Sequence, residues 1–160
     1  MQQPVLVALA LGGNLGPVAE TLGAALRRLE AALGPLQVAP LFRTAAVSPI
    51  PQPDYLNTAA VGRTSLPPDA VLALAKALEH AAGRRPGPRF GPRPLDIDLL
   101  LWDDLVCSAP ELTLPHPRLR ERRFVLEPLA ALVPELAVPP DGRTVAELLA
   151  GVAGQVVERL

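Results

Sequence analysis

Residues 95–102, LDIDLLLW, form a short apolar segment that contains two carboxylates, Asp96 and Asp98. Its length and apolar character are typical of a buried β-strand, in which alternate side chains share one face of a sheet. The leucine and isoleucine side chains at alternate positions then face a core covered by helices. The two carboxylates project together from the opposite face, with Cα atoms roughly 6–7 Å apart. Because carboxylates are rarely buried unless they are paired or bind a metal, this segment predicts an open, metal-binding sheet face.

The order of the other elements predicts the fold class. Apolar periodicity and Pro/Gly punctuation indicate a strand at 4–11, a helix at 17–33, a strand at 36–47 with a proline interruption, a strand at 55–66, a helix from Pro67 to near Gly83, and the strand at 95–102. Helices are also expected around 118–132 and near 144–151. This order predicts an α+β protein with a ferredoxin-like βαββαβ core, an antiparallel sheet and additional C-terminal helices.

Composition indicates one globular domain spanning residues 1–160. Hydrophobic residues make up 49% of the chain, which is enough for a sizeable core, and no linker or repeat divides it. No apolar run approaches the roughly 18–20 residues that span a bilayer, and the N-terminus lacks the basic start of a signal peptide. The single Cys107 cannot form an internal disulfide. We therefore expect a cytoplasmic protein without membrane contact.

Arginine dominates the basic residues, because Lys76 is the only lysine among 15 basic side chains. Eight arginines fall in two short windows: Arg84, Arg85, Arg89 and Arg93, and then Arg118, Arg120, Arg122 and Arg123. Arginine is suited to bidentate phosphate binding. Biased genome composition or thermal adaptation would explain the same abundance, and composition alone favours neither interpretation.

The first arginine window lies in GRRPGPRFGPRP at 83–94, a segment too rich in Gly and Pro for regular structure, directly before the two aspartates. Mg²⁺ prefers carboxylates together with water and substrate phosphates, so arginines beside a carboxylate pair predict a polyphosphate ligand. Lys76 has no Walker glycines before it, which excludes a P-loop. The turn GGNLG at 12–16 does not match a dinucleotide motif either. That turn could hold a ligand or serve only as a tight turn.

The segment RFGPRPLDIDLL at 89–100 resembles the signature of the 6-hydroxymethyl-7,8-dihydropterin pyrophosphokinase family. Further segments agree with that family in the same order: ALGGNLG near the start, FRTAAVSP at 42–49, QPDYLN at 52–57, GR at 83–84, LTLPHP at 112–117 and RFVLEPL at 123–129. The resemblance covers nearly the whole chain. It implies a ferredoxin-like fold and transfer of pyrophosphate from MgATP to the hydroxymethyl group of the pterin, with release of AMP, in folate biosynthesis.

The resemblance also implies roles for individual residues. Two magnesium ions would be bound by Asp96 and Asp98, and catalysis would depend on Arg84, Arg93, Asp96 and Asp98. ATP would contact Lys76, Glu79, Arg84, Arg93, Ile97, His116 and Arg122. The pterin would lie between Tyr55 and Phe124, with Asn57 at its polar edge and Thr44, Ala45 and Val47 lining the same pocket. The partners implied are these small molecules alone, with no nucleic acid, and we expect a monomer.

Each of these roles has a simpler alternative. His116 could be an ordinary loop residue between two prolines, Glu79 a solvent-facing helix residue, and the two aromatics core side chains. The arginine segment is also one residue shorter than is usual in the family, which leaves the roles of Arg85 and Arg89 open. No residue is assigned as a general base.

Two other protein classes compete with this interpretation. Nucleotidyltransferases also carry Asp-x-Asp on a strand, but their glycine turn lies a few residues before the acidic pair, whereas GGN and DID are more than 80 residues apart here. A ferredoxin-like nucleic-acid-binding module needs stacking aromatics on a basic sheet face. Aromatic residues make up only 3% of this chain, and its exposed sheet face carries acid.

Overall fold

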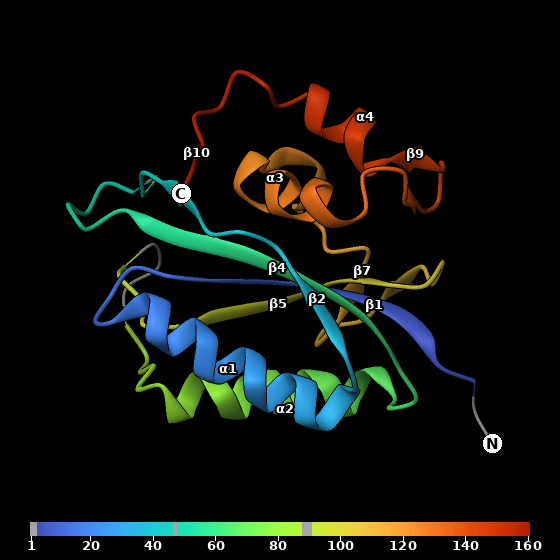
Figure 1. The fold of residues 1–160 in the computed structure, drawn as a ribbon, viewed down its shortest axis with the longest axis horizontal. Coiled ribbons are helices and arrows are strands. Elements are labelled where there is room, and N and C mark those ends of the chain that lie inside the picture. Colours follow the sequence, from blue (N-terminus) through green and yellow to red (C-terminus); the bar gives the residue numbers. More distant parts are fainter. Residues whose placement is uncertain (1–2, 47, 88–90) are drawn as a thin grey trace.

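The computed structural model describes residues 3–46, 48–87 and 91–160. Helices α1 and α2 lie on one face of a main sheet, and α3 lies on the other face with α4 packed against it (Figure 1). The elements of the first part are β1 (Val5–Gly13), α1 (Val18–Leu33), β2 (Leu36–Val38), β3 (Phe42–Thr44), β4 (Tyr55–Thr64), α2 (Pro68–Ala81) and β5 (Asp96–Trp102). They are followed by β6 (Cys107–Ser108), β7 (Thr113–Leu114), a 3-10 helix (Leu119–Glu121), α3 (Arg123–Leu132), β8 (Ala137–Val138), β9 (Arg143–Thr144), α4 (Val145–Ala150) and β10 (Glu158–Arg159).

The main sheet is antiparallel and has the strand order β10-β3-β4-β1-β5, with β2 also paired to β4. The central strand β1 pairs with β4 along its whole length and with β5 on its other side. The predicted strand at 36–47 is two short strands, and Pro40 lies between them, where its missing N–H would interrupt a ladder. The ferredoxin-like order expected from the sequence is confirmed.

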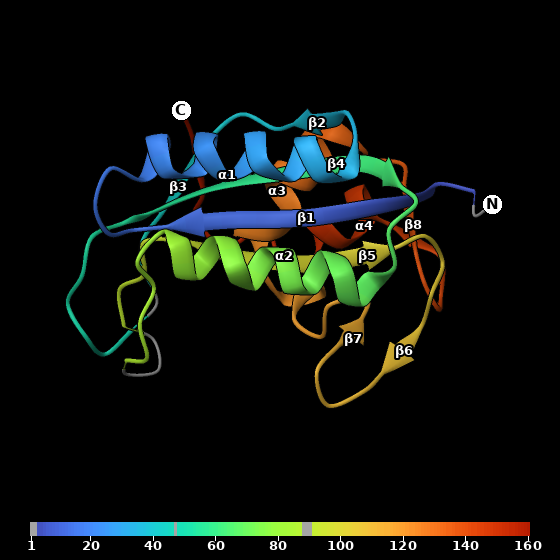
Figure 2. The same cartoon turned by 90° about the horizontal axis from the view of Figure 1, so that it is seen from below.

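Helices α1 and α2 lie side by side across one face of the sheet (Figure 2). Leu22 and Leu29 of α1 and Val71 of α2 are almost fully buried against Leu9 and Ile97 of the sheet. The 3.6-residue spacing of these apolar side chains gives each helix one buried stripe. The alternate apolar positions of β5 therefore face α1 and α2, as the sequence predicts.

Helix α3 lies on the opposite face with α4 packed against it, and their buried side chains form a second core with Ala8, Ala59 and Leu101 of the sheet (Figure 1). The prediction of one helix over 118–132 is wrong at its start. A 3-10 turn ends at Glu121, and Arg122 is extended, with φ −122° and ψ 106°, before α3 begins. Leu119 and Leu126 are both fully buried and lie seven residues apart, which gives the continuous helical period seen in the sequence.

A β-bulge changes the alternation of β5 after the two aspartates. Leu9 pairs with Leu99 and Ala8 with Leu101, so Leu100 is the extra residue. Leu100 and Leu101 consequently both pack under α3 and α4. Among the described residues no helix is long and apolar enough to cross a membrane.

Candidate active site

Strand β5 presents its two carboxylates on the face that α3 and α4 leave open. The side chains of Asp96 and Asp98 are each 32% exposed, whereas Ile97 between them is buried under α1 and α2. In the neighbouring strand β1, Asp96 pairs with Gly12 and Asp98 with Ala10. Neither of these small residues has a side chain that extends beyond a Cβ atom over the neighbouring carboxylate.

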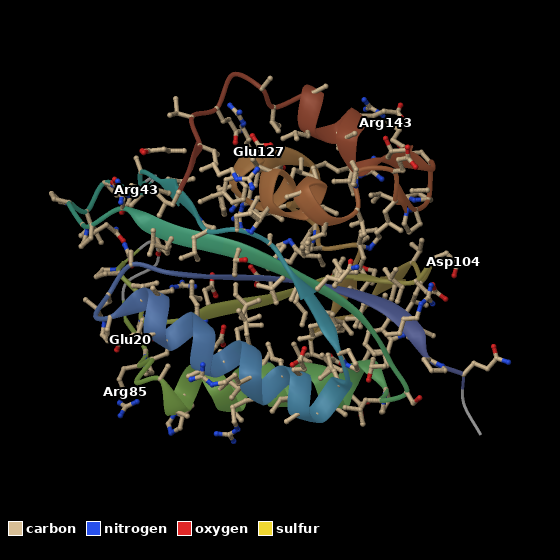
Figure 3. All side chains as sticks on the ribbon, viewed as in Figure 1. Glu20, Arg43, Arg85, Asp104, Glu127 and Arg143 are labelled. Atoms are coloured by element: carbon tan, nitrogen blue, oxygen red, sulfur yellow. The ribbon has the colours of Figure 1, made fainter. Side chains whose placement is uncertain are left out.

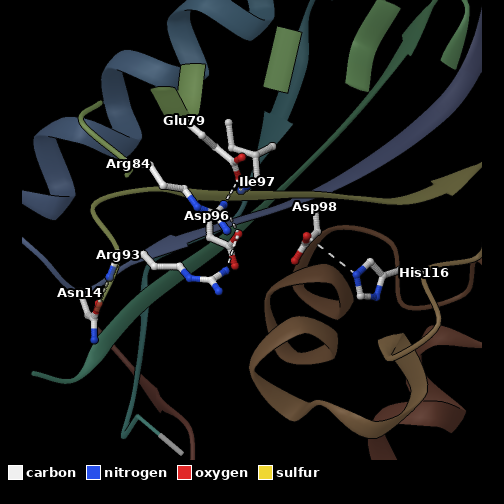
Figure 4. A network of polar contacts seen from close by, with 8 residues as sticks. All are labelled: Asn14, Glu79, Arg84, Arg93, Asp96, Ile97, Asp98 and His116. Carbon is white, nitrogen blue, oxygen red and sulfur yellow. Dashed lines mark hydrogen bonds and ion pairs between the residues drawn. The ribbon is translucent and has the colours of Figure 1, made fainter. Parts of the chain in front are cut away.

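Asp96 has two arginine partners from the segment between α2 and β5 (Figure 4). The Nη1 atom of Arg84 lies 3.0 Å from Asp96 Oδ1, and the Nη1 atom of Arg93 lies 3.7 Å from the same oxygen. Arg84 Nη1 also donates to Oε2 of Glu79 at 2.7 Å. The arginines expected to hold phosphates are therefore held beside the carboxylate expected to hold a metal.

Glu79 connects helix α2 to the start of β5. Its Oε2 accepts the backbone N–H of Ile97 at 2.8 Å as well as the Arg84 guanidinium (Figure 4). Burial raises the pKa of Glu79, and the Ile97 N–H and the charge of Arg84 oppose that rise. A solvent-facing role for Glu79 is thus excluded, and this carboxylate positions the main chain between the two aspartates. The side chain of Ile97 faces the core, so only its main chain could contact ATP.

Asp98 lies beside His116, whose Nε2 is 3.8 Å from Asp98 Oδ1 (Figure 4). The backbone N–H of His116 donates to the carbonyl of Leu100 at 2.8 Å, which fixes the imidazole next to the edge strand β5. Burial and the charge of Asp96 raise the pKa of Asp98 to about 7, against an opposing effect of Arg122. Burial and Arg122 lower the pKa of His116, which favours the neutral form of its imidazole.

Arg122 is the extended residue that precedes α3, and its guanidinium carbon is 5.4 Å from the ring centroid of Phe124. This distance is within the range of a cation–π contact. Burial lowers the pKa of Arg122, and Arg118 adds to that effect while the two aspartates oppose it. The extended conformation of Arg122, which the sequence did not predict, therefore brings this candidate phosphate-binding residue into contact with Phe124, a candidate pterin-binding residue.

The candidate pterin residues of β3 and β4 lie on the same sheet face as the two aspartates. In β4, Tyr55, Asn57 and Ala59 occupy every second position and therefore share one face, and Ala59 packs under α3 and α4. The Nδ2 atom of Asn57 donates to Thr44 Oγ1 at 2.9 Å in a buried contact. Asn57 pairs with Gly12, which in turn pairs with Asp96, so one row of the sheet joins the two candidate sites.

The remaining predicted residues are placed less closely together. Ala45 is exposed after β3, Phe124 packs partly against the core under α3 and α4, and Val47 lies outside the described residues. A cleft of about 330 Å³ beside α2 is lined by Lys76, Glu79, His80, Arg84, Arg85, Pro86, Gly87, Pro92 and Arg93. It includes four of the expected ATP residues but neither His116 nor Arg122. Arg85 is exposed at the periphery (Figure 3), and Arg89 lies outside the described residues.

The donor set fits magnesium bound together with a polyphosphate. Among the described residues, no three His, Cys, Asp or Glu side chains gather as a complete metal cage. Mg²⁺ commonly binds one or two carboxylates and completes its octahedron with water and phosphate oxygens. Two partly exposed carboxylates, of which Asp98 has a pKa raised by burial and by the charge of Asp96, meet that requirement.

Asn14 was not predicted as a site residue. It is buried directly after β1 and forms hydrogen bonds with Gln52 and Arg93, which lie on either side of the site. Its position in the GGNLG turn was the available signal, because that turn left a role beyond chain reversal open. The contacts themselves join segments 38 and 79 residues away, so no local pattern predicts them.

Comparison with known proteins identifies the family. A model of the 7,8-dihydro-6-hydroxymethylpterin-pyrophosphokinase family, HPPK, matches residues 8–134. The chain belongs to this family. A 2-amino-4-hydroxy-6-hydroxymethyldihydropteridine pyrophosphokinase from Pseudomonas aeruginosa is 40% identical over 158 residues, covering 96% of each chain. One from Synechocystis is 38% identical over 144 residues, covering 88% of this chain and 73% of the relative.

A solved structure shares the fold. A Plasmodium falciparum HPPK-DHPS crystal structure superposes with a TM-score of 0.75 at 15% identity and covers 95% of this chain and 45% of the other. At that identity the likeness supports the fold alone. The family assignment confirms the resemblance found in residues 89–100, and with it pyrophosphokinase activity in folate biosynthesis.

Proposed function

We propose that Asp96 and Asp98 bind two magnesium ions together with ATP, and that the pterin binds in front of Asn57 on the same sheet face. The observation that supports this placement is the row Asn57, Gly12, Asp96, which crosses three adjacent strands. Neighbouring strands are about 4.8 Å apart, so the row separates the two side chains by roughly 10 Å. That spacing suits a flat bicyclic ring at one end and a phosphate chain at the other.

The reaction is the transfer of a pyrophosphoryl group to an alcohol. The hydroxymethyl oxygen of the pterin forms a bond to the β-phosphorus of ATP, and the bond from that phosphorus to the α–β bridging oxygen breaks. The hydroxyl proton is released, AMP leaves, and pterin pyrophosphate is formed. Magnesium ions bound with ATP would neutralise the phosphate oxygens and the charge that develops on them.

Protein side chains supply the remaining positive charge. Arg84 and Arg93 lie against Asp96, so small side-chain movements would bring both guanidiniums to the triphosphate. Arg122 adds a guanidinium near Asp98 on the other side, where the uncharged His116 imidazole can donate or accept a hydrogen bond. In phosphoryl transfer, such positioning and charge stabilisation account for most of the catalysis.

Aromatic and amide groups would recognise the pterin. Tyr55 and Phe124 would cover the two faces of the ring, and Asn57 would hydrogen-bond its polar edge. The Thr44 hydroxyl already accepts one Asn57 amide proton, which fixes the orientation of the carboxamide. A pocket with fixed hydrogen-bonding groups discriminates strongly against analogues that lack matching groups.

We further propose a monomer that acts in the cytoplasm on small molecules only. Among the described residues, the large exposed hydrophobic side chains are Leu15, Val38, the adjacent Leu105 and Val106, Val156 and Leu160. Scattered residues of this kind are ordinary on monomer surfaces. The open sheet face carries the two aspartates, which disfavours nucleic acid as a ligand for that face.

One assay tests the reaction and its site together. The protein is incubated with ATP, Mg²⁺ and 6-hydroxymethyl-7,8-dihydropterin, and the nucleotides are separated by chromatography. We expect AMP and pterin pyrophosphate in a one-to-one ratio, with loss of both products in the Asp96→Asn variant. Stoichiometric ADP would show an ordinary kinase and overturn the proposal.

A further inference from the structure

Asn14 is a nearly fully buried polar residue in the turn between β1 and α1, with an exposed fraction of 4%. Its Nδ2 atom donates to Gln52 Oε1 at 2.8 Å and to the carbonyl of Pro53 at 3.0 Å. Its Oδ1 atom accepts the backbone N–H of Arg93 at 2.9 Å (Figure 4). Both amide protons and the amide oxygen of this side chain are therefore used.

The two segments that Asn14 connects belong to different halves of the proposed site. Gln52 and Pro53 lie three and two residues before Tyr55, which begins β4 on the proposed pterin side. Arg93 lies three residues before Asp96, and its guanidinium contacts that carboxylate on the proposed phosphate side. A displacement of either segment must therefore strain the hydrogen bonds of Asn14 to the other.

The main chain around Asn14 is held equally closely. Its backbone N–H donates to the carbonyl of Arg93 at 2.9 Å, so Arg93 and Asn14 exchange two hydrogen bonds. A Cβ atom added to Gly13 would lie 2.5 Å from the Pro94 carbonyl oxygen. The two backbone segments therefore lie closer together than a side chain at position 13 would allow. This contact does not yield to small movements.

We propose that Asn14 is a positioning residue that couples the binding of ATP to the binding of the pterin. The inference rests on the proposed placement of the two substrates. A triphosphate bound by the Arg93 guanidinium restrains Arg93, Arg93 restrains the Asn14 carboxamide through the N–H that it donates, and the carboxamide restrains Gln52 and Pro53 on the pterin side. Binding of either substrate then lowers the free-energy cost of ordering the site for the other.

The experiment measures the dissociation constant of the pterin with and without a non-hydrolysable ATP analogue and Mg²⁺. Couplings between sites are typically roughly 5–150-fold, and we expect the unaltered protein to bind the pterin more tightly by a factor in this range when the analogue is present. In Asn14→Ala the ratio should fall to within about twofold of one. Asn14→Asp keeps an acceptor for the Arg93 N–H, but it places a carboxylate oxygen against Gln52 Oε1 and the Pro53 carbonyl oxygen. Because these two contacts lie on the pterin side, the variant should weaken pterin binding more than analogue binding.

Thr64→Ala is the matched control, because Thr64 is a buried polar residue at the far end of β4 whose hydroxyl accepts the Leu66 N–H at 3.1 Å. It should lower the melting temperature and leave the ratio unchanged. Of the hydrogen bonds of Asn14, Gln52→Ala removes only the one between Asn14 Nδ2 and Gln52, and Gln52 is less buried than Asn14. It should lower the ratio partly, and it tests the inference even if Asn14→Ala does not fold.

Three results would overturn the inference: a ratio of one in the unaltered protein, an unaltered ratio in Asn14→Ala and Gln52→Ala, or an equal loss in Thr64→Ala. Formation of AMP by the unaltered protein tests the reaction separately. A protein that forms AMP but shows any of these results retains the proposed function and loses only the role of Asn14.

Discussion

The Nη1 atom of Arg84 lies 3.0 Å from Asp96 Oδ1, so a carboxylate expected to bind magnesium already has a cationic partner. Glu79 shares the same guanidinium at 2.7 Å and holds it in place from α2. A metal ion that approaches Asp96 alone must compete with this arginine. A metal ion that arrives with ATP brings phosphate oxygens to which the displaced guanidinium can bind.

We therefore predict opposite effects of Arg84→Ala on two ligands. Affinity for Mg²⁺ alone should rise by roughly 2–5-fold, because a partly exposed ion pair of this kind contributes up to about 1 kcal/mol. Affinity for MgATP should fall, because the phosphates lose a guanidinium. Isothermal titration measures both. Arg85→Ala is the control, because it removes the same charge from an exposed residue that has no contact with Asp96. Equal gains in Mg²⁺ affinity in both variants would indicate a general charge effect.

Asp96→Asn and Asp98→Asn should each reduce kcat by at least roughly 100-fold, since a bound metal contributes several kcal/mol to phosphoryl transfer. Both side chains lie on the open face, so circular dichroism should show an unchanged fold. Asp104→Asn, at the opposite end of β5 (Figure 3), makes the same chemical change away from the site and should keep full activity. Near-normal turnover of either site variant at saturating Mg²⁺ would contradict the metal-binding role.

The pKa of Asp98 predicts how stability depends on pH in the metal-free protein. Burial and Asp96 raise this pKa from 3.8 to about 7. Between those pH values the folded protein binds a proton that the unfolded chain has released, so the free energy of unfolding falls as pH rises through this window. Asp98→Asn removes the effect. With EDTA present, its melting temperature relative to the unaltered protein should increase from pH 4 to 7 and then stay level; a pH-independent difference would exclude this assignment.

The sequence predicted those parts of the site that depend on local pattern. Two-residue alternation in β5 placed Asp96 and Asp98 on one face, and Gly and Pro marked the irregular segment before them. Helical spacing predicted α1 and α2 correctly because each buries a single apolar stripe. These signals lie within one element, and tertiary contacts reinforce them.

Other features depend on residues that are distant in sequence. The bond from Glu79 to the Ile97 N–H requires the packing of α2 on β5, and the Asn14 bonds require three turns to meet at one end of the sheet. The β6–β7 and β8–β9 pairs and β10 have two residues per strand, too few to show a period. The extended Arg122 interrupts a helical pattern that remains in phase across the break.

Gly12 should be required for pterin recognition for steric reasons. A Cβ at this position would lie 2.6 Å from Asn57 Oδ1 and 3.1 Å from the Leu56 carbonyl oxygen. Gly12→Ala should therefore displace the Asn57 carboxamide and weaken pterin binding by about tenfold, or 1.4 kcal/mol. Gly23→Ala, within α1, is the control and should leave pterin affinity unchanged while raising helix stability. Unchanged pterin affinity in Gly12→Ala, measured by fluorescence titration, would place the pterin elsewhere.

Phe124 could contribute to pterin binding, to core packing, or to both. Its half-buried ring packs against the core under α3 and contacts the Arg122 guanidinium, so it contributes to packing wherever the pterin binds. Phe124→Ala should weaken pterin binding by about 1–3 kcal/mol, the range for loss of an aromatic anchor. ATP affinity should change little, because an exposed cation–π contact contributes only about 0.5–1 kcal/mol to the position of Arg122.

Phe124→Leu decides between the roles because leucine fills most of the same volume without an aromatic face. If Phe124 stacks on the pterin, the leucine variant should keep most of its melting temperature but bind the pterin nearly as weakly as the alanine variant. If Phe124 serves packing alone, leucine should restore both properties together, since volume-conserving apolar substitutions cost less than about 1.5 kcal/mol. Melting temperature and the two dissociation constants, measured on both variants, distinguish these patterns. An alanine variant that is destabilised but binds the pterin normally would exclude Phe124 from the pocket.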